Sequence, residues 1–146
     1  MATSLKILVT GPTGTTGRAV VKELLDRGHK VTGMSRNPQH WGVHPDYTPV
    51  QGSQTGDVDA LTEIVDGHDV VVSAFAPSHS YGAETYHGIV EGAWRMKVAV
   101  KRSRSQPYLI YIGGAGKSRM YILSLNPSAN WRNVRQLRKS DRPRNG

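Results

Sequence analysis

The chain has 146 residues, a formal net charge of +8 at pH 7 and no cysteine. The length suits one domain, and the lack of cysteine excludes disulfides, thiolate metal sites and a cysteine nucleophile. The N-terminus shows no signal-peptide pattern, and no apolar run approaches the roughly 20 residues that a membrane span needs. We therefore expect a cytoplasmic protein with no membrane partner.

Short apolar, β-branched runs alternate with helical patterns along most of the chain. Strands are predicted over residues 5–10, 29–35, 47–51, 69–76 and 107–112. Helices are predicted over residues 15–27, 58–65 and 85–100, where apolar residues recur at helical spacing. Asp57 is placed to cap the second helix. This alternation predicts an α/β fold, a doubly wound parallel sheet with strand order 3-2-1-4-5.

Three glycines spaced three residues apart follow the first predicted strand and open the first predicted helix. Gly11 permits a tight turn, Gly14 leaves room for a pyrophosphate, and Gly17 lets the helix pack against the strand. Hydroxyl donors flank these glycines at Thr13, Thr15 and Thr16. A helix N-terminus attracts anions, so the pattern favours a dinucleotide site over a purely structural turn.

The end of the second strand indicates which dinucleotide is bound. An acidic residue there would accept the ribose 2′-hydroxyl, but this strand ends with Ser35 and Arg36. A guanidinium beside a hydroxyl suits a phosphate, which favours NADP over NAD as cofactor. An ordinary surface arginine is the alternative reading. We expect no metal site, because Gly42 and Pro45 break any helix that would bring His40 and His44 together.

Residues 6–17 and 28–38 resemble the atypical short-chain dehydrogenase/reductases. More narrowly, they are similar to the NAD(P)-binding group with NmrA-like and biliverdin-reductase-B-like members. Asp57 and residues 70–77 and 108–116 fall where that family has its adenine-side loop, fourth strand and fifth strand. The resemblance covers roughly residues 5–116 and implies a Rossmann fold.

The resemblance also implies where the cofactor lies. NADP would cross the glycine loop, and Arg36 would bind its 2′-phosphate. The path of the nucleotide would be lined by Ala74, Phe75, Ala76 and Pro77. The next residues along the chain, Ser78 and His79, would lie toward the nicotinamide.

No catalytic residue is assigned. The larger family uses a Tyr-x-x-x-Lys pair, yet none of the six tyrosines here is followed by lysine four residues later. Ser78, His79 and Tyr81 could donate a proton or could be solvated loop residues. An NAD(P)-dependent oxidoreductase and a non-enzymatic NADP sensor therefore both remain open, and the substrate and oligomeric state are not predicted.

The resemblance ends after Gly116, as if the domain were cut short after its fifth strand. Eight of the 19 Lys and Arg residues lie beyond this point, with Asp141 as the one acidic residue there. We predict a Rossmann domain over residues 1–116 and a basic tail over residues 117–146, either disordered or aberrant in its coding. Residues 120–125 could add one strand or helical turn. Nucleic-acid binding through the tail is the weaker alternative function.

Overall fold

The computed structural model describes residues 3–38, 44–75, 83–113 and 119–123 of the chain, without side chains for residues 83–86, 113 and 119–123. The strands are β1 (Lys6–Thr10), β2 (Lys30–Ser35), β3 (Tyr47–Gln51), β4 (Val70–Ser73), β5 (Tyr108–Gly113) and β6 (Arg119–Leu123). The helices are α1 (Thr15–Asp26), α2 (Val58–Val65) and α3 (Ala83–Arg102). None of these helices is long and apolar enough to cross a membrane.

The strands form one sheet in the order β3-β2-β1-β4-β5-β6. The first five are parallel, which confirms the predicted order 3-2-1-4-5. Strand β6 pairs with β5 in the antiparallel direction, so of the two alternatives for residues 120–125 the structure has the strand. The predictions for the rest of the tail lie outside the described residues.

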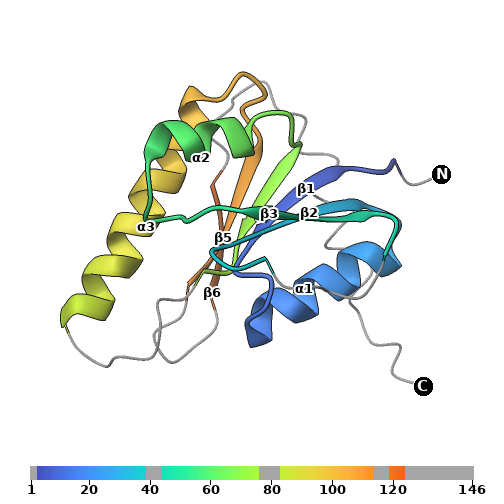
Figure 1. Ribbon diagram of the computed structural model, residues 1–146, viewed down its shortest axis with the longest axis horizontal. Coiled ribbons are helices and arrows are strands. Elements are labelled where there is room, and N and C mark those ends of the chain that lie inside the picture. The colour runs from blue at the N-terminus through green and yellow to red at the C-terminus, as the bar shows by residue number, and fades with distance from the viewer. Residues whose placement is uncertain (1–2, 39–43, 76–82, 114–118, 124–146) are drawn as a thin grey trace.

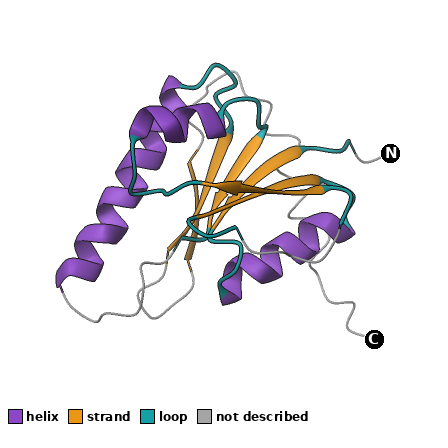
Figure 2. Ribbon diagram, in the orientation of Figure 1, coloured by secondary structure: helices purple, strands orange, loops and turns teal. Residues whose placement is uncertain are grey.

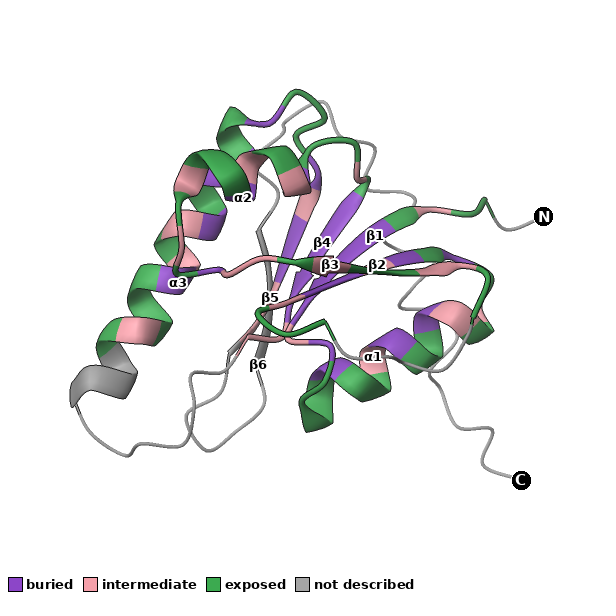
Figure 3. Ribbon diagram, in the orientation of Figure 1, coloured by how far each residue is buried: buried purple, intermediate pink, exposed green. Residues whose placement is uncertain are grey.

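The sheet is the middle layer of the molecule, with helices on both faces. Helices α2 and α3 pack side by side on one face, and α1 lies on the other (Figures 1 and 2). On the face of α2 and α3, the largest buried residues are Leu8, Leu61, Met96 and Leu109. On the face of α1, the core includes Ile7, Val9, Val21 and Val31. The central strands β1 and β4 are accordingly buried except at Lys6, the first residue of β1, as expected for parallel strands covered on both sides (Figure 3).

Element boundaries agree with the sequence prediction to within one residue, except in α3 and β4. Strand β3 and helix α2 have the predicted bounds. Helix α3 is two residues longer than predicted at each end, and its last turn includes Lys101 and Arg102, two cations that the C-terminal end of a helix dipole favours. Strand β4 ends at Ser73 rather than residue 76, although the Ala74 N–H still donates to the Thr10 carbonyl at 3.1 Å.

Candidate cofactor site

The loop between β1 and α1 requires two of its three glycines for its own folding. Gly11 has a φ of +69°, and a Cβ there would lie 2.7 Å from the Ala74 carbonyl oxygen. A Cβ at Gly17 would overlap the carbonyl oxygen of Gly11 and lie 2.7 Å from its carbonyl carbon. Gly17 therefore brings the first turn of α1 against the end of β1, as the sequence predicted.

Gly14 differs, because nothing in the described part of the chain crowds it. A Cβ there would meet the Gly11 carbonyl oxygen at 3.7 Å, an ordinary contact. Gly14 is the N-cap of α1 with extended backbone angles (φ −72°, ψ 168°) that any residue can adopt. Packing within the described protein therefore does not require a glycine at position 14. A ligand that approached the backbone there would require it, because a Cβ would fill the space that the ligand occupies.

The first turn of α1 has no capping side chain. Its N-cap residue has no side chain to accept a hydrogen bond, and no acidic residue lies in the turn. The flanking hydroxyl residues Thr13, Thr15 and Thr16 are all exposed. Because the first N–H groups of a helix have no partner within it, this turn presents unpaired donors at the positive end of the helix dipole.

The end of β2 lies beside this loop. Thr10 and Met34 are register partners on the parallel strands β1 and β2, and the Gly11 N–H donates to the Met34 carbonyl at 3.3 Å. Ser35 is half-buried and Arg36 is exposed, two residues beyond this contact. The glycine loop and Arg36 are therefore at the same edge of the sheet, on neighbouring strands.

The end of β4 forms the other side of the site. Ala74 and Phe75 are half-buried and follow the strand directly. The Phe75 ring lies against α3, where a Cβ added to Gly92 would be 3.1 Å from its Cε1 atom. The remaining residues that the resemblance placed here, Ala76, Pro77, Ser78 and His79, lie outside the described residues, as does Tyr81, the other possible proton donor.

Sequence reasoning missed a buried glutamine under this edge. Gln54, in the loop between β3 and α2, is 1% exposed. Its Oε1 accepts hydrogen bonds from Thr10 Oγ1 at 2.8 Å and from Ser73 Oγ at 3.0 Å. Its Nε2 donates to the Gly92 carbonyl oxygen at 3.0 Å. One side chain thus joins β1, β4, α3 and its own loop.

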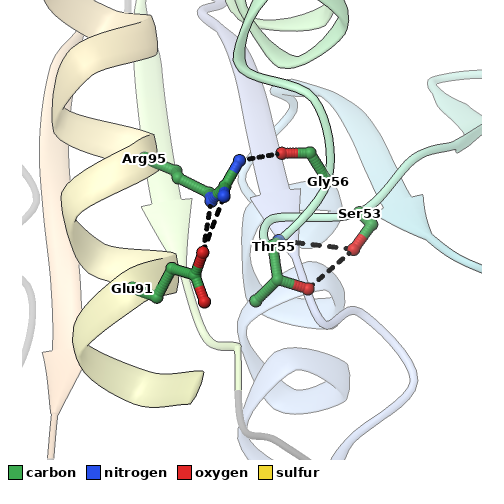
Figure 4. A network of polar contacts seen from close by, with 5 residues as sticks. All are labelled: Ser53, Thr55, Gly56, Glu91 and Arg95. Atoms are coloured by element: carbon green, nitrogen blue, oxygen red, sulfur yellow. Dashed lines mark hydrogen bonds and ion pairs between the residues drawn. The ribbon is translucent and has the colours of Figure 1, made fainter. Parts of the chain in front are cut away.

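A second contact joins the same loop to α3. Arg95 Nη1 donates to the Gly56 carbonyl oxygen at 2.6 Å, while Nε and Nη2 bind Glu91 Oε1 at 3.0 and 2.6 Å (Figure 4). The loop is further shaped by Ser53 Oγ, which accepts from the Thr55 N–H at 3.3 Å. Asp57 then ends the loop as the N-cap of α2, as predicted, with its carboxylate accepting from the Asp59 and Ala60 N–H groups.

The three tyrosines whose side chains the structure describes show no sign of an activated phenol. Burial raises the pKa of the hydroxyls of Tyr47, Tyr108 and Tyr111 above the usual value. A catalytic tyrosine needs the opposite shift.

Within the described residues there is also no group of three or more His, Cys, Asp or Glu residues that could hold a metal ion. The loops at the carboxyl ends of β2, β1 and β4 lie side by side, and their open helix terminus and arginine suit an elongated, anionic ligand.

Known proteins are similar to this chain in sequence or in fold. A 3 beta-hydroxysteroid dehydrogenase/Delta 5→4-isomerase of Mycobacterium tuberculosis is 41% identical over 66 residues, which cover 45% of this chain and 18% of that protein. A protein from Bacteroides thetaiotaomicron proposed to be an epimerase superposes with a TM-score of 0.65 at 26% identity, over 78% of this chain and 49% of its own. The enzyme WbmH of Bordetella bronchiseptica, solved in complex with NAD+, gives a TM-score of 0.57 at 26% identity, over 68% of this chain and 36% of its own.

The chain therefore spans about half or less of the length of these relatives. They bear out the resemblance to atypical short-chain dehydrogenase/reductases and the Rossmann-like fold. The family model described as NAD(P)H-binding matches residues 11–106, which is well over half of the chain and runs from the glycine loop to the start of β5. The chain belongs to this NAD(P)H-binding family.

Proposed function

We propose that this domain binds NADP(H) in preference to NAD(H). The pyrophosphate would lie over Gly14 at the open first turn of α1, and the 2′-phosphate would bind Arg36. The observation that carries this proposal is the open N-terminal turn, where a glycine without a packing role precedes unpaired N–H groups. The hydroxyls of Thr13, Thr15 and Thr16 would add donors along the same path.

The preference for the phosphorylated dinucleotide rests on the end of β2. The strand ends in Ser35 and Arg36, so no carboxylate is there to repel a 2′-phosphate or to accept a ribose hydroxyl. The WbmH structure holds NAD+, so the fold alone does not select NADP. The choice between them is therefore assigned to Arg36 rather than to the architecture.

We propose oxidoreductase chemistry as the activity class, with a nicotinamide cofactor and a small-molecule substrate. The curated relative is a dehydrogenase, which supports this class. The second candidate is a non-enzymatic protein that senses NADP, a role that needs the cofactor site but no proton donor. In either case the glycine loop, Arg36, Ala74, Phe75 and Ala76 would hold the cofactor.

Thermal unfolding with NADP and NAD added separately tests the binding proposal, because a ligand of the native state raises the midpoint. We expect a larger shift with NADP. Arg36→Ala should weaken NADP binding about tenfold and leave NAD binding unchanged, since a charge-assisted contact contributes about 1.5–3 kcal/mol. Arg104→Ala removes another exposed arginine, near the amino end of β5, and is the matched control. Equal shifts with the two cofactors would overturn the role given to Arg36.

Enzyme and sensor differ in turnover. An oxidoreductase should consume NADPH faster when a carbonyl or flavin substrate is added, whereas a sensor should bind NADPH without consuming it. Absorbance of NADPH follows this directly. Stabilisation by NADP with no consumption across both substrate classes would favour the sensor.

A further inference from the structure

Gln54 lies where the parts of the proposed cofactor site meet. Thr10, which donates to its Oε1, is the residue directly before Gly11, and Ser73, the other donor, is directly before Ala74. The third partner, the Gly92 carbonyl, belongs to the segment of α3 that the Phe75 ring contacts. Each partner is thus within one residue of the site or in direct contact with it.

The orientation of this amide is fixed by its partners. A carbonyl oxygen can only accept, so the nitrogen of Gln54 must face Gly92. Its oxygen then accepts from two hydroxyls, each of which can turn its proton toward it. Three of the four hydrogen-bonding positions of the amide are filled, and the side chain is 1% exposed.

The loop that carries Gln54 has a second attachment to the same helix. Arg95 donates to the Gly56 carbonyl, two residues beyond Gln54 (Figure 4). The loop from residue 52 to residue 57 is therefore held to α3 at two points and to β1 and β4 at a third. A buried amide network of this kind has one well-defined arrangement, because any displaced member leaves a costly unpaired polar group.

We propose that Gln54 is a positioning residue of the cofactor site, which holds the glycine loop, the end of β4 and the loop between β3 and α2 in one fixed arrangement. This inference rests on the proposed function. Gln54 does not itself contact the cofactor. It sets the separation of Gly11 and Ala74, whose backbones lie so close that a Cβ on Gly11 would be 2.7 Å from the Ala74 oxygen.

The direct test replaces the amide without changing side-chain length. Gln54→Met should raise the dissociation constant for NADP about tenfold, since it leaves Thr10, Ser73 and Gly92 without their buried partner. Ser73→Ala removes one donor and keeps the amide in place, so it should raise the dissociation constant by a smaller factor. Ser103→Ala is the matched control, because it removes a buried hydroxyl that donates to the Val100 carbonyl at the amino edge of the sheet.

Gln54→Glu supplies a rescue that a loss of general stability would not. When protonated, the carboxyl has the same shape as the amide and can donate to the Gly92 carbonyl, whereas the carboxylate would face that oxygen with a negative charge. The charged residues that the structure shows bonded at this loop and on α3 include Arg95 with Glu91, Arg102 with Asp59, and Asp57, which caps α2. Relative to the wild type at each pH, the affinity of this variant for NADP should recover as the pH falls from about 8 to about 6.

The outcomes separate the two proposals. Urea unfolding first shows which variants are folded under the binding conditions, and if Gln54→Met does not fold, Ser73→Ala and the pH recovery of Gln54→Glu decide. Folded variants that bind NADP like the wild type would overturn the role of Gln54 and leave the proposed function intact. A wild-type protein that binds neither NADP nor NAD would overturn both. Equal losses in Ser103→Ala and Gln54→Met would show a stability effect and overturn the positioning role.

Discussion

Two of the helix N-termini at the carboxyl edge of the sheet, those of α1 and α2, are built in opposite ways. Helix α1 starts at Gly14, with no side-chain cap and no acidic residue in its first turn. Helix α2 starts at Asp57, whose carboxylate accepts from two of the helix's own N–H groups, and Asp59 lies in its first turn. The α2 terminus is capped by a side chain of the chain itself, whereas the α1 terminus has no such cap. This contrast supports the proposed anion site at α1, beside the evidence of its glycines.

The largest effect is expected at the glycine that packs the open helix on the sheet. In Gly17→Ala the new Cβ would overlap the Gly11 carbonyl oxygen, which neither backbone can avoid without moving. The free energy of unfolding should fall by about 3 kcal/mol, as for a severe overpacking substitution. Urea unfolding followed by circular dichroism measures this, and a midpoint equal to that of the wild type would show that the described packing of α1 on β1 is wrong.

Gly14→Ala separates the ligand-facing glycine from the packing glycine. Its Cβ has room within the described protein and its backbone angles suit alanine, so the fold should be retained. The dissociation constant for NADP should rise about tenfold, because the methyl group would occupy space that the pyrophosphate needs. Isothermal titration gives this value. Unimpaired NADP binding would mean that the cofactor does not approach the backbone at Gly14.

Substitution at the N-cap of α2 should affect stability more than NADP binding, the reverse of Gly14→Ala. Asp57→Ala removes the N-cap of α2 and should lower the free energy of unfolding by about 1 kcal/mol, with a smaller loss of NADP affinity than in Gly14→Ala. Asp57→Asn is the control, since asparagine caps helices about as well as aspartate. A loss of NADP affinity in Asp57→Ala equal to that in Gly14→Ala would break the contrast between the two termini.

The smallest effect concerns the opposite end of α1. His29 follows the C-terminal end of this helix, is 6% exposed, and accepts a hydrogen bond from the Leu5 N–H on Nδ1. Burial, and secondarily the charge of Arg27, lowers the pKa of His29 below its usual 6.5. The unfolded chain therefore takes up the proton first, and stability present above pH 6.5 should decline as the pH falls from there to the folded-state pKa.

Urea unfolding across this pH range checks the prediction. His29→Asn is the control, because an amide oxygen can accept from the Leu5 N–H without titrating. The decline should be smaller in this variant than in the wild type. An identical decline in both proteins would assign the pH dependence to other groups.

Local patterns made much of the fold and of the open helix terminus predictable. The bounds of β3 and α2 and the capping role of Asp57 follow from nearby residues alone, because strand propensity and helix capping are short-range effects. The roles of Gly11 and Gly17 follow from the strand-loop-helix context. Arg36 could be placed at the correct edge because parallel neighbouring strands end together.

Gln54 could not be predicted in this way. Its partners Thr10, Ser73 and Gly92 are 44, 19 and 38 residues away in the chain. A single glutamine in a polar loop carries no periodic pattern and is usually exposed. Gln54 is buried because β1, β4 and α3 pack around its loop. This packing belongs to the tertiary structure and leaves no pattern in the neighbouring sequence.

The most direct test of the central claim follows the backbone amides of both helix termini by nuclear magnetic resonance while NADP is added. We predict that the amide signals of residues 15–17 shift in a saturable way, because the pyrophosphate would accept from N–H groups of this first turn, whereas the Gly14 N–H already donates to the Gly11 carbonyl. The signals of Asp59 and Ala60 should shift less, because Asp57 already accepts from them. Unchanged signals at residues 15–17 under saturating NADP, or larger shifts at Asp59 and Ala60, would contradict the account.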